Sequence, residues 1–205
     1  MTIICSHRVN SAAVLGTVDE KYGVEMDLRS HGEQIHLVHD PFVLGEKFEE
    51  WLDAYHHAFI VLNVKEEGLE DRIMEILNRR GINAWAFLDQ SVPFLVRTLR
   101  GGESRCMVRV SEYESIETAL SLPNRPDWVW LDSFTGGLPS AADIRRLHDH
   151  GFQMMVASPE LQGRDLAAEI SGITELFVSA GVPLAGVCTK RPEVWNSAYA
   201  PGSSA

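Results

Sequence analysis

The segment AFIVLNVKEEGLEDRIMEILNRRGINAWAFL, residues 58–88, decides the predicted fold. An apolar, β-branched run at 58–64 is followed by a helical pattern at 66–79, and a second apolar run occupies 84–88. The helical part has acids at its start and arginines at its end, as the helix dipole favours, and its apolar residues lie on one stripe: Leu69, Ile73, Ile76 and Leu77. Strand, helix and strand in this order predict two parallel strands joined by a helix.

The same alternation runs along the whole chain. Further strand-like runs occupy residues 3–5, 24–28, 106–110, 128–131, 153–157 and 184–188. Weaker helical patterns cover residues 10–22, 47–56, 91–99, 115–121, 141–150 and 164–180. An alternating segment at 34–38 follows the turn signal His31-Gly32 and predicts a hairpin extension of the second strand.

Eight strand–helix units favour closure of the parallel sheet into a ring, so the predicted α/β fold is a single compact (β/α)8 TIM barrel with short loops. An open flavodoxin-like or Rossmann sheet is the alternative, although no G-x-G-x-x-G follows the first strand. The chain has 205 residues, which leaves about 25 for each unit and little room for a specificity domain. We expect the barrel to span residues 1–195 and a flexible tail to follow at 196–205.

Charge and composition narrow the classes of partner. The chain has 18 basic and 29 acidic residues, a net charge of −11, which is the wrong sign for a protein that coats nucleic acid or anionic lipid. A small ligand or a metal cation is therefore the expected partner. No apolar run reaches the ~18 residues of a membrane span, and the start MTIICSHRVNS does not resemble a signal peptide.

Three cysteines, Cys5, Cys106 and Cys188, lie at wide spacing inside apolar runs, which predicts buried, reduced thiols. Together with the missing signals, this favours a cytoplasmic protein without stable membrane insertion. The sequence carries no signal for an oligomeric state.

Polar side chains, among them Asp89 and Arg109, stand where the predicted strands end, which is where parallel barrels carry their chemistry. In the strand at 24–28, alternation places Glu25 and Asp27 on one face. Two adjacent carboxylates raise each other's pKa unless a cation joins them, and a hard divalent ion suits oxygen ligands. The pair predicts a cation site; an exposed edge strand with its acids in water is the alternative.

Four more polar residues follow neighbouring strands. His7 and His39 each end an apolar run and precede a charged residue, and imidazole is the side chain best suited to move protons near neutral pH. Asn63 and Lys65 share one strand face, where an amide oxygen can bind a metal and an ammonium can hold a phosphate. Structural roles are the alternative: a satisfied histidine, or polar groups that bond loop backbone.

Later strand ends add Glu112, Asp132 and Glu160, with Arg164 nearby. These side chains are candidates to line the far side of the pocket and to bind a sugar or polyol group. Capping of the following helices is the alternative, because Ser, Asp and Glu in such loops often cap.

The set His-Arg at 7–8, Glu-x-Asp at 25–27, His-Asp at 39–40 and Asn-x-Lys at 63–65 resembles, in order and spacing, the glycerophosphodiester phosphodiesterase family. That family belongs to the phosphatidylinositol-phospholipase-C-like phosphodiesterase barrels. The resemblance implies that His7 and His39 are the acid–base pair and that Glu25 and Asp27 bind a divalent cation. It further implies that Arg8 and Lys65 face the phosphate and that position 63 completes the metal site.

The chain departs from the family pattern in three places. Asn63 stands where the family has glutamate, which should weaken cation binding by removing one negative charge. Val-Asn-Ser-Ala at 9–12 replaces Pro-Glu-Asn-Thr. Thr189-Lys190-Arg191-Pro192 stands where the family has Thr-Asp-x-Pro, so that Lys190 brings a cation in place of a carboxylate and is a candidate to bind substrate.

The expected function is metal-assisted hydrolysis of a small phosphodiester, sugar- or glycerol-linked and soluble, with Mg²⁺, Ca²⁺ or Mn²⁺ as the cation. A metal-independent version, in which arginine and lysine carry the charge, is the first alternative. A barrel that binds sugar phosphates or phosphodiesters without turnover is the second. A Schiff-base aldolase using Lys65 or Lys190 is the third, although neither lysine lies in an evidently apolar strand interior.

Overall fold

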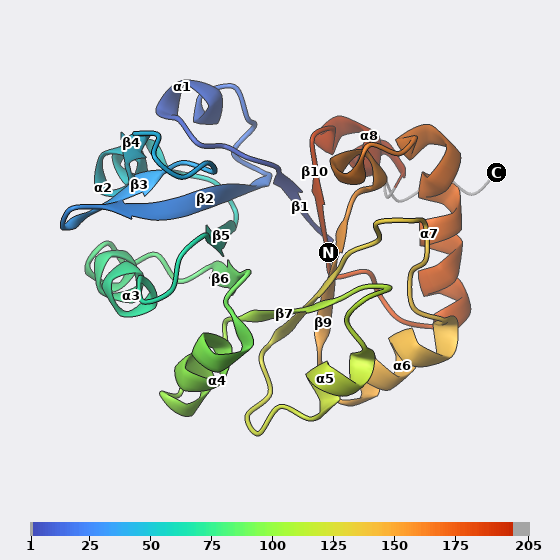
Figure 1. Cartoon of the computed structure of the whole chain (residues 1–205). Helices are drawn as coiled ribbons and strands as arrows, with labels where there is room; N and C mark the ends of the chain where they lie inside the picture. Colours follow the sequence, from blue (N-terminus) through green and yellow to red (C-terminus); the bar gives the residue numbers. More distant parts are fainter. Residues whose placement is uncertain (1, 199–205) are drawn as a thin grey trace.

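The computed structural model describes residues 2–198 (Figure 1). Its parallel strands are β1 (Ile3–Ser6), β2 (Gly23–His31), β5 (Ile60–Val64), β6 (Trp85–Leu88), β7 (Met107–Val110), β8 (Trp128–Leu131), β9 (Gln153–Ala157) and β10 (Gly186–Thr189). Two short strands, β3 (Gln34–Leu37) and β4 (Glu46–Lys47), extend β2 in antiparallel pairing. The helices are α1 (Ala12–Leu15), α2 (Phe48–Trp51), α3 (Glu70–Arg79), α4 (Val92–Arg100), α5 (Ile116–Leu120), α6 (Ala141–Asp149), α7 (Leu166–Ala180) and α8 (Pro192–Ala198). Two 3₁₀ turns, η1 (Leu52–Ala54) and η2 (Pro159–Gln162), complete the described elements.

The parallel strands follow the order β6-β5-β2-β1-β10-β9-β8-β7, and a helix follows each of them along the chain. The ends of this order meet at β6 and β7, where the ladder thins to one parallel bridge between Phe87 and Cys106. There the Phe87 N–H donates to the Arg105 carbonyl oxygen across 2.9 Å. The predicted (β/α)8 barrel is thereby confirmed, with a weak seam between β6 and β7, and the open-sheet alternative is wrong.

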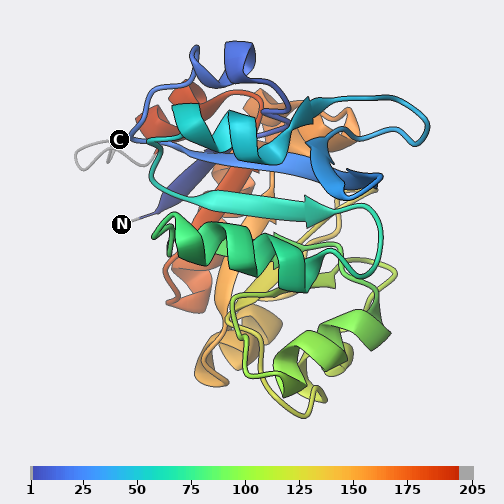
Figure 2. The ribbon, with the colours of Figure 1, turned by 90° about the vertical axis from the view of Figure 1, so that its left-hand side faces the viewer.

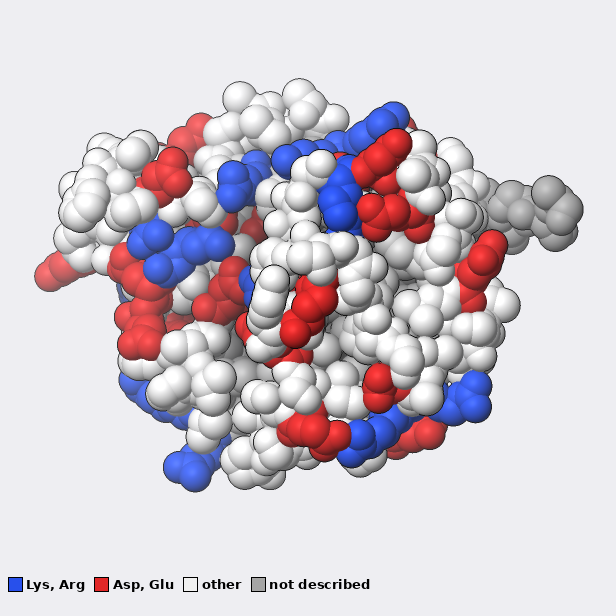
Figure 3. Space-filling view, turned by 45° about the vertical axis from the view of Figure 1, so that its right-hand side comes forward, with Lys and Arg blue, Asp and Glu red and all other residues white. Residues whose placement is uncertain are grey.

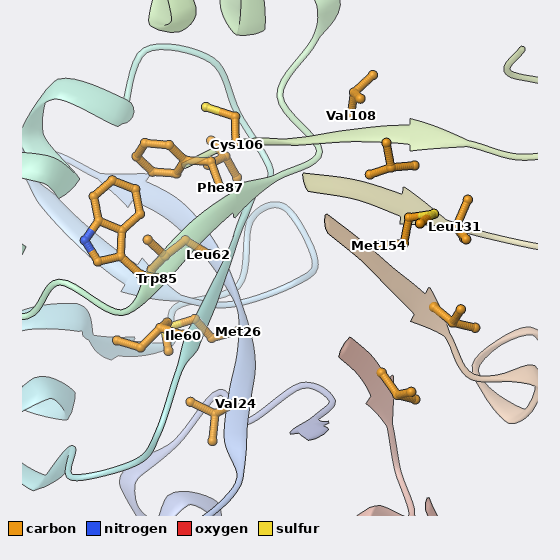
Figure 4. Packing of buried hydrophobic residues seen from close by; sticks show 14 of the residues in the cluster. Val24, Met26, Ile60, Leu62, Trp85, Phe87, Cys106, Val108, Leu131 and Met154 are labelled. Carbon is orange, nitrogen blue, oxygen red and sulfur yellow. The ribbon is translucent and has the colours of Figure 1, made fainter. Parts of the chain in front are cut away.

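Strand alternation divides the apolar side chains between two cores. Outward residues such as Val24, Met26 and Leu62 pack under the helices (Figure 4). Inward residues, among them Met107 and Met155, fill the barrel itself. The same alternation turns Glu25 and Asp27 inward, as the sequence predicts, because their neighbours along β2 belong to the outer core.

The three cysteines are buried and free, as predicted. Cys5 and Cys188 lie inside the barrel, where burial raises the pKa of each thiol above its ordinary value and keeps it protonated.

The structure differs from the sequence prediction in two segments. The expected helix at 47–56 is shorter and irregular: Lys47 pairs with His36 of β3, α2 starts at Phe48, and the 3₁₀ turn η1 ends at Ala54. Helix α8 was not predicted, and its residues 196–198 fall within the expected tail. Buried Trp195 anchors this helix through an indole N–H bond to Ser158 Oγ, 2.8 Å long. The rest of the expected tail, 199–205, lies outside the described residues.

Across residues 2–198, none of the helices has both the length and the apolar character that crossing a bilayer requires.

Candidate active site

A polar cavity of about 230 Å³ opens at the carboxyl ends of the parallel strands. Each of the eight parallel strands, or the loop that follows it, contributes to the wall. Four carboxylates line the cavity, those of Glu25, Asp27, Asp89 and Asp132. Four cationic side chains also line it, those of Arg8, Lys65, Arg109 and Lys190. The formal charges of these eight groups cancel, so the cavity is highly polar without a net charge of its own.

Glu25 is almost fully buried, with 1% of its surface exposed. Its Oε2 accepts from the Arg8 backbone N–H across 2.8 Å, and its Oε1 accepts from Asn63 Nδ2 across 2.9 Å. Burial, and then the nearby charge of Asp27, raise the pKa of Glu25 to about 7, although both hydrogen bonds oppose the shift. Near neutral pH the protonated and ionised forms of this carboxyl are therefore close in free energy.

Asp27 lies two residues further along β2 and is equally buried. Asn10 forms two hydrogen bonds with Asp27. Asn10 Nδ2 donates to Asp27 Oδ2 across 2.8 Å, and the Asp27 N–H donates to Asn10 Oδ1 across 2.9 Å. This reciprocal pair gives a structural role to Asn10, part of the 9–12 segment that departs from the family pattern. Lys65 Nζ lies 3.3 Å from Asp27 Oδ1, and Arg8 Nε lies 3.8 Å from Oδ2.

Two oxygens of this cluster lack hydrogen-bond partners. Within residues 2–198, neither Asp27 Oδ1 nor Asn63 Oδ1 accepts a hydrogen bond, although both atoms are buried. Buried oxygens without a donor are costly unless something else satisfies them. No group of three His, Cys, Asp or Glu side chains suited to a metal occurs in the described part of the chain, so a cation site here depends on the Asn63 amide.

His7 lies beside Glu25, with 3.7 Å between His7 Nε2 and Glu25 Oε2. Burial lowers the pKa of His7 to about 4. The positive charges of Arg8, Lys190 and Lys65 also lower this pKa, whereas the negative charge of Asp27 raises it. The imidazole is therefore neutral at neutral pH. A neutral imidazole at the wall of a polar cavity is suited to accept a proton.

His39 does not line the cavity with His7. Its side chain is 40% exposed, and its Nδ1 lies 2.7 Å from Asp40 Oδ1. Arg29 holds its backbone near the site, because Arg29 Nε donates to the His39 carbonyl oxygen and Arg29 also donates to that of Lys65. His39 thus stands at the rim of the site, outside its wall.

Asp89 and Arg109 stand at predicted strand ends, but the sequence assigned no role to either. The Arg109 guanidinium donates through separate nitrogens to the carboxylates of Asp89 and Asp132. Asp89 Oδ2 also accepts from Lys65 Nζ across 3.3 Å. Burial raises the pKa of Asp89, but the positive charges of Arg109 and Lys65 outweigh this effect and hold the pKa below its ordinary value. An arginine at an inward position of the otherwise apolar strand MVRV is the signal that could have revealed this network.

The residues predicted at the later strand ends divide into two groups. Asp132 and Lys190 line the cavity. Gln162, which was not predicted, joins them and donates to Asp132 Oδ1 across 2.9 Å. Lys190 is exposed at the mouth and has no ion-pair partner in the described part of the chain.

Glu112 and Glu160 lie outside the lining of the cavity. Glu112 accepts hydrogen bonds from the backbone N–H groups of Phe134, Thr135 and Gly137. Desolvation raises the pKa of Glu112, but hydrogen bonds of this kind outweigh it and hold the pKa well below its ordinary value. Glu160 accepts from the Lys190 N–H across 3.0 Å. Both carboxylates organise loops in the structure, and substrate contact by either remains a prediction.

Fold and site together define a (β/α)8-barrel protein whose polar cavity gathers carboxylates, cations and a histidine at the carboxyl ends of the strands. No family model and no curated protein matches its sequence. In fold, the chain is similar to a glycerophosphodiester phosphodiesterase from Agrobacterium tumefaciens, with a TM-score of 0.70 and 14% identity over 95% of this chain and 99% of that one. It is also similar to a glycerophosphoryl diester phosphodiesterase from Parabacteroides distasonis, with a TM-score of 0.67 and 14% identity over 100% of this chain and 89% of that one. The fold implied by the sequence resemblance is confirmed over nearly the whole chain.

Proposed function

We propose that this chain is a hydrolase of small phosphodiesters. The observation that carries the proposal is the meeting of His7, the Glu25–Asp27 pair and the cations Arg8 and Lys65 in one cavity. Phosphodiester cleavage needs groups of these kinds, because negative charge develops on the phosphoryl oxygens while protons move at the attacking and leaving oxygens. The fold of the solved phosphodiesterases supports the same choice.

The Glu25, Asp27 and Asn63 side chains fit a hard divalent cation, Mg²⁺, Ca²⁺ or Mn²⁺. They supply oxygens from one side of the cavity, and two of these, Asp27 Oδ1 and Asn63 Oδ1, accept no hydrogen bond among the described residues. The raised pKa of Glu25 supports this assignment, since a cation would offset the repulsion between the two carboxylates. A bound cation would act as a Lewis acid on a phosphoryl oxygen.

The remaining side chains bind the phosphate and move protons. Arg8 and Lys190, the exposed cations of the mouth, attract the diester, and Lys65 holds a phosphoryl oxygen deeper in the cavity. Neutral His7 takes the proton of the attacking hydroxyl as its oxygen bonds to phosphorus. The phosphorus–oxygen bond to the leaving alcohol breaks, and we assign the proton that this alkoxide receives to His39 at the rim.

A metal-independent hydrolase is the second candidate, and one observation favours it. Asn63 Nδ2 and Lys65 Nζ already stand against Glu25 and Asp27, where they supply part of the positive potential that a cation would bring. In this version, the lysine and arginine side chains alone would stabilise the charge of the transition state.

The test is hydrolysis of bis-p-nitrophenyl phosphate and of glycerophosphodiesters, with Mg²⁺, Ca²⁺ or Mn²⁺ and again after chelation. The metal-assisted hydrolase loses activity on chelation, and activity that survives assigns the metal-independent version. His7→Ala should lower kcat by about 10²–10⁴, whereas His148→Ala, on the exposed side of α6, should not. Tight binding of a phosphate ester without product would reject both and identify a binding protein.

We also propose that the chain works in the cytoplasm, where its three free thiols would stay reduced. Oxidation of these thiols in the protein isolated from its cells would contradict that location.

A further inference from the structure

Exposed apolar side chains gather at the end of the barrel where the cavity opens. Six of them form what we call the apolar rim: Phe42, Val43, Leu44, Val92, Tyr113 and Phe134. All six lie in the loops or at the helix start that follow carboxyl ends of strands. Among the described residues, Val178 near the end of α7 is an exposed apolar side chain at the opposite end of the barrel. Several exposed apolar side chains around one opening indicate an interaction surface, whereas apolar side chains exposed singly do not.

The loop between β3 and β4 makes the most prominent part of the apolar rim. Figure 2 shows this loop reaching beyond the end of β5. Its Phe42 is fully exposed, and its φ of 64° lies in a region that bulky residues rarely adopt. The loop also begins at the site, because the Val38 N–H donates to the Asp27 carbonyl oxygen across 2.9 Å.

Across the barrel, Tyr113 and Phe134 continue the apolar rim. Their ring centroids lie 5.9 Å apart, and Glu112 joins their two loops by accepting from the Phe134 N–H. A second cavity, about 510 Å³, is lined by Val92 and Tyr113 and shares Asp89 and Arg109 with the site cavity. The paired Asp89 and Arg109 side chains therefore border both the polar site and a cavity with apolar side chains.

The arrangement indicates a fluid, amphiphilic partner. Separate loops that place apolar side chains around a polar opening match a lipid–water interface, which accepts apolar groups at several points while a head group meets the cavity. The net charge of −11 disfavours anionic lipid. On the face in Figure 3, acidic and basic side chains are interspersed, with no broad basic area. Among lipid surfaces, a zwitterionic one fits this charge pattern.

We propose that the apolar rim docks on a zwitterionic lipid surface and that the substrate is an amphiphilic phosphodiester of the phospholipid or lysophospholipid class. This inference rests on the proposed hydrolase function and names its substrate. The head-group diester enters the cavity, and the apolar part of the substrate stays with the apolar rim. The class differs from the soluble diester that net charge alone suggests, because contact by apolar loops needs no basic surface.

The docking test is co-sedimentation with phosphatidylcholine vesicles. The protein should sediment with them, and the double variant Phe42→Asn, Leu44→Ser should lower the bound fraction at least tenfold. Asparagine tolerates the left-handed backbone at position 42, so the variant should fold, which circular dichroism checks. Val178→Ser, an exposed apolar change at the opposite end, is the matched control and should bind as the parent does.

The substrate test compares micellar lysophosphatidylcholine with bis-p-nitrophenyl phosphate. The double variant should lose at least tenfold in kcat/KM on the micelles and keep its rate on the soluble diester. Absence of vesicle binding, binding to phosphatidylserine vesicles alone, or equal loss in Val178→Ser would overturn the docking proposal. Vesicle binding through the apolar rim without hydrolysis of either diester would sustain docking and reject the hydrolase, so the two failures are distinguishable.

Discussion

The side-chain amide of Asn63 donates to Glu25 Oε1 across 2.9 Å, deep in the barrel and at the position where the glycerophosphodiester phosphodiesterase family has a glutamate. A third carboxylate here would face two others, whereas the amide offers a donor to one of them. It thereby stabilises ionised Glu25, and its own Oδ1 is left without a hydrogen-bond donor. Cation affinity and stability of the free protein should therefore oppose each other at position 63.

Asn63→Glu should show that opposition. The new carboxylate adds a hard oxygen ligand, so the dissociation constant for Mg²⁺ or Mn²⁺ should fall at least tenfold. Without the cation, repulsion among three buried carboxylates should lower the unfolding temperature. Calorimetric titration and thermal unfolding with and without chelator measure the two effects. Unchanged cation affinity in a folded variant would remove position 63 from the metal site.

Stability should respond to pH through Glu25. Its pKa is about 7 in the folded chain, against an ordinary value of 4.5, so the folded state binds more protons between these values. The free energy of unfolding therefore loses a contribution as pH rises through this window, on the order of 1–3 kcal/mol. Glu25→Gln removes the effect, and Asn63 can turn its Oδ1 toward the new amide.

Urea unfolding of both proteins from pH 4.5 to 7.5 measures this difference. His7 acts in the opposite direction, because its folded pKa of about 4 is below the ordinary value, but it is common to both proteins and cancels. A constant stability difference across the window would show that Glu25 does not titrate there. Saturating Mg²⁺ should flatten the pH dependence of the parent if the cation binds the carboxylates.

The activity profile should report His7. A base must be neutral to accept a proton, and the pKa of His7 is about 4, so kcat/KM should decline on the acid side near pH 4 and not near the ordinary 6.5. Initial rates on bis-p-nitrophenyl phosphate from pH 3.5 to 8 check this. Retention of the acid limb in His7→Ala would assign it to another group.

Arg109→Met should destabilise the barrel by about 3–5 kcal/mol, because it leaves buried Asp132 and partly buried Asp89 without their shared cation. Arg97→Met is the control: Arg97 pairs with Asp71 at the surface and should cost at most about 1 kcal/mol. Chemical denaturation measures both. Equal losses in the two variants would show that the Arg109 network adds nothing special to the fold.

Lys190→Met and Glu112→Gln distinguish a residue that binds substrate from a residue that holds a loop in place. Lys190 lines the cavity, so its loss should raise KM for a phosphodiester several-fold with little change in stability. Glu112 holds the loop at 133–137, so its loss should lower the unfolding temperature and leave KM for a soluble diester unchanged. A reversed pattern would make Glu112 a substrate ligand, as the sequence suggested.

The period of the apolar residues determined the strands, most of the helices and the inward direction of Glu25 and Asp27. These follow from local rules, since a strand has only two faces and an apolar neighbourhood occupies one of them. Local rules placed the start of the helix at 47–56 one residue too early, because Lys47 pairs with β3. They also missed α8, because the contact that anchors Trp195 comes from a residue 37 positions away.

By itself, the sequence determined the eight-unit barrel and the cluster of polar residues after its first strands, because both depend on pattern and spacing. Only the tertiary structure decided which groups share the cavity. It placed Arg109 between Asp89 and Asp132, turned Glu112 to its loop and left His39 at the rim. The physical reason is that a charged side chain goes to whichever partner the fold brings within hydrogen-bond reach. In a ring closed by residues far apart in sequence, spacing does not specify that partner.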